Sequence, residues 1–134
     1  MPTHASSTFT PKTWDEETSS EVDGRLKITH ARVTFGYSGD LEGESAMQYL
    51  MLYRDDGSAA VIGLERVTGK LCGKPGTFVL QHQGGYADNT ASGEFDVVEG
   101  SASGQLAGLR GHGTAVARKD GTTAFSFDFD LPAQ

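Results

Sequence analysis

Cysteine, proline and tryptophan are scarce in this sequence of 134 residues, which has one Cys, four Pro and one Trp. The single cysteine, Cys72, excludes an intramolecular disulfide and a thiolate cluster for a metal ion. A chain of this length can bury an adequate core without such cross-links. We therefore expect one domain that folds by burying apolar side chains in a reducing cytoplasm.

Long apolar runs and an excess of positive charge are also missing. No run approaches the length of a transmembrane helix, and no apolar stretch near Met1 has the form of a signal peptide. Eleven Lys and Arg stand against eighteen Asp and Glu, a formal net charge of -7. This negative charge disfavours binding to a polyanion or to an anionic membrane surface, so we expect neither nucleic acid nor a membrane as a partner. We expect a cytoplasmic location.

Glycine is abundant, with 18 residues, and part of it recurs in the frame Ser/Thr-Gly-x-Leu-x-Gly. The frame occupies residues 38–43, 68–73 and 103–108. Glycine inside strands marks bulges, barrel corners and close approach of backbones. Three spaced copies predict a sheet that bends repeatedly and closes on itself.

Short alternating patterns predict about eight strands and no long helix. Met1–Ser7 is predicted to be a disordered tail, residues 8–134 the single domain, 15–24 a loop or at most one helical turn, and Asp56-Gly57 a hairpin turn. The fold class is all-β, an antiparallel barrel or sandwich, and the glycine frames favour a single eight-stranded barrel of lipocalin-like shape. The predicted strands cover residues 9–14, 26–37, 44–54, 59–67, 77–86, 93–99, 105–118 and 122–129.

Several segments also carry a likeness to a known group. They are Gly39–Ser45, Tyr53–Gly57, Gly63–Val67, Phe78–His82, Val97–Ser101 and Gly104–Gly111. Through them the chain, from about Phe9 to Leu131, resembles a bacterial domain-of-unknown-function family that is assigned to the allene-oxide-cyclase-like barrels. The resemblance implies an eight-stranded barrel similar to allene oxide cyclase and to the cyclases that close rings in polyketide biosynthesis. It implies no reaction and no catalytic residue.

The interior of an eight-stranded barrel is either filled by side chains or open for one small ligand. Small residues in the strands favour an opening, and aromatic residues favour a filled barrel. We favour the open barrel, with an apolar small molecule as partner. The small residues are Ala46, Ala59, Ala60, Gly63, Ala107, Gly111, Gly113 and Ala115, and the aromatic residues are Phe35, Tyr49, Tyr53, Phe78 and Phe127.

Glu65, Tyr53 and His82 are the candidates for catalysis. Glu65 has apolar neighbours, and a buried carboxylate can act as a general acid or base. The alternative places Glu65 on the outer face, paired with a residue such as Arg66. His82 either shuttles protons at the end of a pocket or lies half-exposed at a strand end. Tyr53 can donate a hydrogen bond to a substrate carbonyl.

Glu44, Tyr49, Arg110 and Phe78 are the candidates for substrate binding. Arg110 either binds a carboxylate or enolate or forms an ion pair with an acidic residue on the next strand. Glu44 is a second candidate carboxylate, Tyr49 a hydrogen-bond donor and Phe78 an apolar contact. The histidines lack the spacing of metal ligands and no phosphate-binding loop is present, so we expect no metal and no cofactor.

These features favour a cofactor-independent cyclase or isomerase acting on an apolar unsaturated metabolite. Such a reaction needs mainly orientation and one or two polar groups. Two alternatives remain open at this point. One is a non-catalytic ligand-binding or stress-associated barrel, and the other is a filled barrel whose exposed aromatic face mediates self-association into a homo-oligomer.

Overall fold

The structure is a computed structural model that describes residues 3–22, 26–118 and 121–131. Within these ranges the backbone forms strands and turns, and no helix is long and apolar enough to cross a membrane. The strands are β1 (Thr3–Val22), β2 (Leu26–Gly39), β3 (Leu41–Tyr53), β4 (Ala59–Leu71), β5 (Lys74–Ala87), β6 (Thr90–Val97), β7 (Ser103–Gly104), β8 (Arg110–Arg118) and β9 (Thr123–Asp130).

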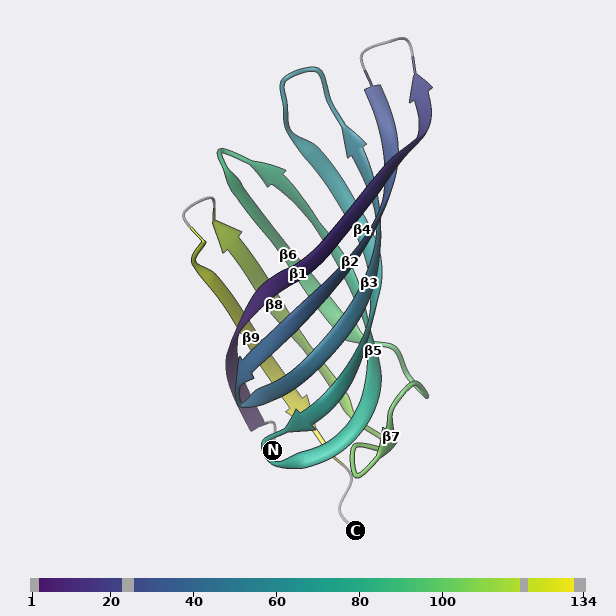
Figure 1. The fold of residues 1–134 in the computed structure, drawn as a ribbon. Coiled ribbons are helices and arrows are strands. Elements are labelled where there is room, and N and C mark those ends of the chain that lie inside the picture. The colour runs from purple at the N-terminus through teal and green to yellow at the C-terminus, as the bar shows by residue number, and fades with distance from the viewer. Residues whose placement is uncertain (1–2, 23–25, 119–120, 132–134) are drawn as a thin grey trace.

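Eight strands form a closed antiparallel barrel (Figure 1). Around the ring they follow the order β1-β2-β3-β4-β5-β6-β8-β9, and β9 pairs again with β1. The short β7 lies outside the ring, where its two residues pair with Gly76 and Thr77 of β5. The predicted eight-stranded antiparallel barrel is confirmed.

The two ends of the barrel differ. The hairpins β1–β2, β3–β4, β5–β6 and β8–β9 project from one end, which we call the open end (Figure 1). At the other end lie the start of β1 and the segment that carries β7, and we call this the closed end. Leu41, Leu71 and Leu106 are completely buried there, and each is the leucine of one glycine frame. The three frames therefore supply a plug.

Glycines of the frames also permit close packing of the backbone at the closed end. A Cβ atom on Gly69 would lie 2.0 Å from the carbonyl oxygen of Glu42, so no other residue fits without displacing β3. The predicted role of the frames in bending the sheet agrees with this close approach. Three glycines of the frames and Gly76 of β5 are paired in one row across β3, β4, β5 and β7: Gly43, Gly69, Gly76 and Gly104.

The N-terminal predictions are corrected. Thr3–Ser7 is strand and not tail, because it pairs with β9 and buries Ala5, while Met1 and Pro2 lie outside the described residues. Residues 15–22 are strand and not loop, because β1 continues in register beside β2, and 23–25 lie outside the description. Both segments are polar, and their conformation is determined by pairing, with β9 for residues 3–7 and with β2 for residues 15–22, which local composition does not show.

The segment predicted as one strand over residues 105–118 also differs. Residues 105–109 form a turn, in which the amide of Leu109 donates to the carbonyl of Leu106 at 3.0 Å, and β8 begins only at Arg110. The turn brings Leu106 and Leu109 together inside the closed end, where both are buried. Burial of two apolar side chains outweighs continuation of the strand.

The closed half of the barrel is filled by aromatic rings. Phe95 stacks on Phe125 at a centroid distance of 4.8 Å, and Phe78 stacks on Phe127 at 6.3 Å. A Cβ on Gly113 would lie 2.6 Å from the ring of Phe95. Gly113 thus makes room for a ring rather than for a ligand, which corrects the assignment of this glycine to a cavity wall.

Candidate functional site

The open half of the barrel encloses a cavity of about 370 Å³. The sequence left two alternatives for the interior, an open barrel and a filled barrel. Each describes one half of the molecule, since the closed half is filled and the open half is not. Ala59 and Ala115 line the cavity, as expected, whereas Ala60 and Ala107 do not. The aromatic side chains of its wall are Phe9, Trp14, Phe35, Tyr49, Tyr53 and Tyr86.

A buried carboxylate, Glu65, lies at the boundary between the two halves. Its side chain is only 1% exposed. One oxygen, Oε2, accepts hydrogen bonds from the hydroxyl groups of Tyr37 and of Ser45, the latter at 2.5 Å. The other oxygen, Oε1, lies 2.7 Å from Nε2 of His82. Three neighbouring donors thus satisfy a charge that would otherwise be costly to bury.

His82 connects this carboxylate to the cavity. Its imidazole lines the cavity wall and packs on Phe95 at a centroid distance of 5.3 Å. When Nε2 carries the proton that is donated to Glu65, a neutral ring keeps its lone pair on Nδ1. In the described part of the chain no side chain or backbone group is hydrogen-bonded to Nδ1. The second ring nitrogen therefore remains available for proton exchange.

Two tyrosines close to Glu65 remain protonated donors. Burial, followed by the negative charge of Glu65, raises the pKa of Tyr37 well above its ordinary value. The same two causes, in the same order, raise the pKa of Tyr49. Tyr49 lines the cavity, and among the described residues its hydroxyl has no hydrogen-bond partner. It can therefore donate a hydrogen bond to a ligand.

A second polar cluster centres on Glu16, beside the part of the cavity wall that lies toward the open end. We call this part, which is lined by Trp14, Tyr53 and Tyr86, the mouth of the cavity. Its carboxylate accepts hydrogen bonds from Thr29 at 2.7 Å, Tyr53 at 2.8 Å and Trp14 at 3.0 Å. Burial alone would raise the pKa of Glu16, but these hydrogen bonds and the charge of Lys27 together lower it. Burial and Glu16 raise the pKa of Tyr53 to about 12.

Comparison with known proteins assigns the chain to a family. The family described as "Protein of unknown function (DUF3224)" matches residues 5–129. The chain belongs to the DUF3224 family. A crystal structure of a DUF3224 protein of unknown function from Shewanella oneidensis is similar, with 27% sequence identity and a TM-score of 0.81, over 99% of this chain and 100% of that chain. No curated protein matches. Membership of an unknown-function family with a barrel fold is thus confirmed.

The structure separates the predicted site residues into two groups. Glu65, His82, Tyr49 and Tyr53 come together at or behind the cavity of this DUF3224 barrel. Phe78 faces inward but belongs to the filled half, where it is completely buried and does not line the cavity. Its expected ligand contact is therefore corrected to a role in the core.

Glu44 and Arg110 are corrected more strongly, because both lie on the outer face. Glu44 is exposed and forms an ion pair with Lys12 at 2.7 Å. Arg110 is exposed and lies 3.7 Å from Glu99. Side chains alternate along a strand, so Glu44 has the opposite direction to Ser45, which faces the interior. Neither charged group can reach a ligand in the cavity.

Sequence reasoning missed Tyr37, Ser45, Trp14 and Glu16. Tyr37 and Ser45 share the inward phase of the apolar residues on their strands, so phase alone was a usable signal for them. Trp14 was the last residue of the predicted strand 9–14 and Glu16 belonged to the predicted loop that follows, so the face that they share was not apparent. They share one face of β1 after the register shift that follows Pro11.

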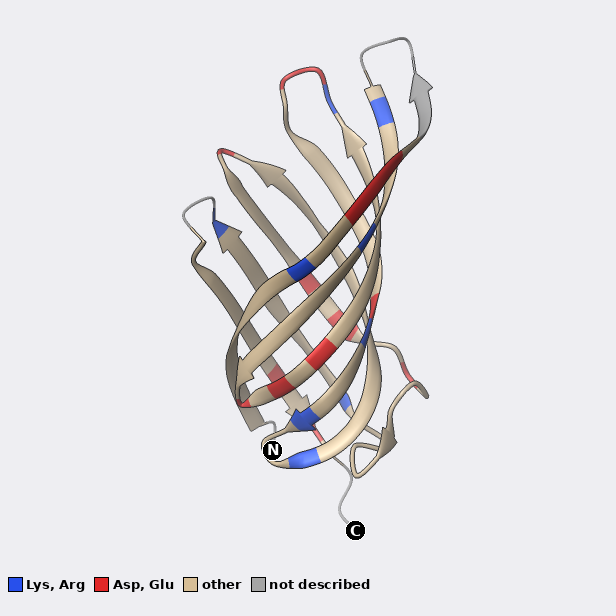
Figure 2. Cartoon of the chain, in the orientation of Figure 1, with Lys and Arg blue, Asp and Glu red and all other residues tan. Residues whose placement is uncertain are grey.

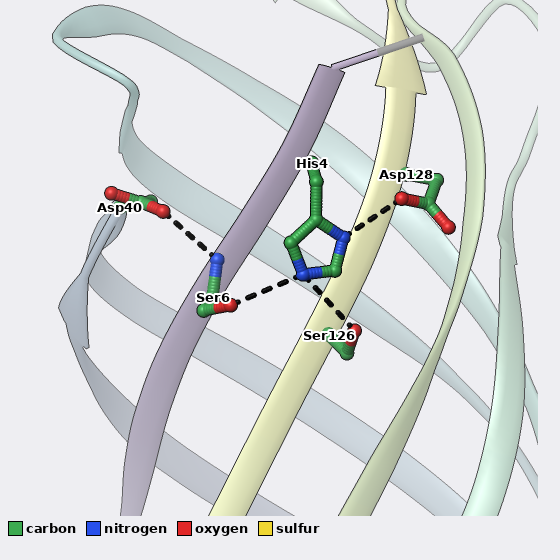
Figure 3. Close-up of polar contacts among 5 residues, drawn as sticks. All are labelled: His4, Ser6, Asp40, Ser126 and Asp128. Carbon is green, nitrogen blue, oxygen red and sulfur yellow. Dashed lines mark hydrogen bonds and ion pairs between the residues drawn. The ribbon is translucent and has the colours of Figure 1, made fainter.

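Figure 3 shows a third cluster, on the outer seam between β1 and β9. Nδ1 of His4 lies 2.8 Å from Asp128, and Nε2 lies 3.2 Å from the hydroxyl of Ser6. This is the order of groups in a hydrolase triad, but the amide of Ser6 donates to the Asp40 carboxylate at 2.9 Å. A negative charge therefore occupies a place where an oxyanion would need a donor. The cluster stabilises the pairing of β1 with β9, which closes the barrel.

Proposed function

We propose that this DUF3224 barrel is a cofactor-independent isomerase or cyclase that acts on an apolar unsaturated small molecule. One observation carries the proposal: His82 lines an apolar cavity on one side and contacts the buried Glu65 on the other. A histidine held by a carboxylate is an effective general base, because the carboxylate fixes the ring and stabilises the imidazolium that forms.

The proposed reaction is an internal proton transfer. Nδ1 of His82 removes a proton from an activated carbon of the ligand, so that a C–H bond breaks and an N–H bond forms. The same nitrogen then returns the proton to another atom of the ligand, before or after a ring closes. No oxidant, reductant or other reactant is needed. Tyr49 donates its hydroxyl proton in a hydrogen bond to the oxygen on which negative charge develops.

Tyr37 and Ser45 support the reaction indirectly. Both donate to Glu65, so the carboxylate keeps its position while the charge on His82 changes. They are positioning residues, since neither lines the cavity. The aromatic walls supply orientation and exclude water from the reacting atoms.

The proposal is tested by exchange in heavy water. A panel of unsaturated ketones and polyenes is incubated with the protein, and deuterium uptake and retention time are measured. We expect deuterium in at least one compound, together with a shift in retention time that reports the product. His82→Gln should abolish both, because glutamine can still contact Glu65 but is no base. His112→Gln, on the outer face of β8, is the matched control and should keep both.

A second function, binding without turnover, is supported by the composition of the wall. Most residues that line the cavity are apolar or small, and such a wall retains a ligand without chemistry. In that case a panel compound would shift the thermal unfolding of the protein and be recovered without deuterium. This outcome would overturn the catalytic proposal and leave the binding role.

A further inference from the structure

We infer that the ligand of this cavity carries a positive charge, as an apolar amine or quaternary ammonium compound, and not a carboxylate. The inference rests on the proposed function in one respect, since it takes the cavity of the open half as the ligand site. It names the chemical class that enters, which the proposed reaction leaves open.

The first observation is the aromatic wall near the mouth. Trp14 stacks on Tyr49 with a centroid distance of 6.1 Å and an interplanar angle of 29°, and Tyr53 and Tyr86 line the same cavity. Trp14 is 52% exposed, so a large part of its surface is accessible to solvent and to a ligand at the mouth. The faces of tryptophan and tyrosine rings attract cations, and such rings line the sites that recognise quaternary ammonium groups.

The second observation is the carboxylate at the same place. Both oxygens of Glu16 are held by side chains that line the cavity, Oε1 by Trp14 and Oε2 by Tyr53. Hydrogen bonds that favour the charged form keep Glu16 ionised at neutral pH. An ammonium group at the aromatic wall therefore has a fixed negative charge close by.

Lys27 shows that the mouth accommodates an ammonium group in this way. Its Nζ lies 5.2 Å from the centroid of the Tyr53 ring, and its charge contributes to the lowered pKa of Glu16. Lys27 is exposed and does not line the cavity. A ligand carboxylate would thus compete with Glu16 for Lys27, whereas a ligand ammonium would gain a second cation–aromatic contact.

The surrounding charge agrees with this choice. Figure 2 shows acidic residues on β1 and at the tips of the β3–β4 and β5–β6 hairpins, around the open end. Among the described residues that line the cavity, none is Lys or Arg, so a carboxylate would find no permanently charged side chain inside to pair with. A negative field at the mouth attracts cationic ligands and repels anionic ones. The described charged residues of the strand ends and turns at this end of the barrel, with Lys27 of β2 and Arg118 of β8 included, are Asp15, Glu16, Glu17, Lys27, Arg54, Asp55, Asp56, Asp88 and Arg118.

The test uses three probes of matched shape: phenylbutylamine, phenylbutanol and phenylpentanoate. Trp14 is the single tryptophan of the chain and lines the cavity, so its fluorescence reports occupancy, and calorimetry checks the affinities. We expect the amine to bind about tenfold more tightly than the alcohol, and the carboxylate most weakly. Binding of all three with equal affinity, or best binding of the carboxylate, overturns the charge inference and leaves the proposed function standing. Failure of all three to bind overturns both.

Two variants locate the source of the preference. Glu16→Gln should remove most of the difference between amine and alcohol while both still bind. Glu17→Gln removes the next carboxylate on the same strand, which is exposed, and should keep the difference. Added salt should weaken the preference of the native protein, since charges near the surface are screened. An unchanged preference in Glu16→Gln contradicts the inference.

Discussion

Nε2 of His82 lies 2.7 Å from Oε1 of Glu65, at the boundary between the filled half of the barrel and its cavity. The two residues belong to neighbouring strands, but they are not directly paired. Glu65 is opposite Leu80, and His82 is opposite Gly63, so the contact is diagonal across the β4–β5 pair. A Cβ atom on Gly63 would lie 2.6 Å from the carbonyl oxygen of Gln48 and 3.1 Å from the ring of Tyr49, so the glycine makes room for β3 and its tyrosine.

Removing the carboxylate should destabilise the barrel. In Glu65→Leu the hydroxyl groups of Tyr37 and Ser45 lose their acceptor inside the protein. Each unsatisfied buried donor costs about 1–3 kcal/mol, so for two donors we expect a loss of about 2–6 kcal/mol in the free energy of unfolding, measured by urea denaturation. Glu65→Gln keeps an acceptor oxygen and should lose less. The exposed Glu94→Gln is the control, and an equal loss in that variant would refute the account of the network.

The glycine row should tolerate no side chain. Gly69→Ala places a Cβ 2.0 Å from the carbonyl oxygen of Glu42, so the strands must separate locally. We expect a loss of more than about 2 kcal/mol in urea denaturation. In the control Gly36→Ala the new Cβ meets only the flexible end of the Lys12 side chain, at 2.9 Å, and stability should change by less than about 1 kcal/mol. Similar losses in both variants would contradict the close approach.

The leucine plug should contribute strongly to stability. Leu106→Ala removes a completely buried side chain from the closed end and should cost about 2–5 kcal/mol. Leu50→Ala, at a site that is 47% exposed on the outer face of β3, should cost less than about 1 kcal/mol. The stabilities of the two variants are measured by thermal or urea unfolding. An unchanged free energy of unfolding in Leu106→Ala would show that the turn over 105–109 does not close the barrel.

The barrel itself follows from the sequence, because alternation and turn signals are local. Asp56-Gly57 is a turn with positive φ at Gly57, as predicted, and the strands on either side pair in register. The path of β1 could not be predicted from its own residues. Residues 15–22 form strand by pairing with β2, and residues 3–7 form strand by pairing with β9, the last described strand of the chain. Composition carries no information about such distant partners.

The sequence identified several residues of the site, but it did not predict which of them are in contact. Glu65 and His82 stand out individually, by their apolar neighbours and their residue types. Their contact depends on the register of β4 and β5, and a shift of one residue would turn Glu65 to the outer face. Glu44 illustrates the converse: it has the right chemistry, but the parity of Met47 and Tyr49 on the same strand places it outside.

Acid should release the cluster at the mouth. Since the pKa of Glu16 is lowered in the folded protein, its charged form stabilises the fold above the unfolded-state pKa. This contribution is lost as the pH falls through the lowered folded-state pKa. Protonation weakens the hydrogen bond from Trp14, so we expect a fluorescence transition below the ordinary range of a glutamate. Glu16→Gln should abolish it, and Glu17→Gln should not. A transition that persists in Glu16→Gln would assign it to another group.

Ring opening of nitrobenzisoxazole is the most direct test of the central claim, that His82 is a base in an apolar cavity. Removal of the carbon-bound proton breaks the N–O bond and releases a coloured cyanophenolate, so the rate reports proton transfer alone. The account predicts saturable ring opening by the native protein, at least about a hundredfold slower in His82→Gln and unchanged in His112→Gln. A rate in His82→Gln equal to that of the native protein would contradict it.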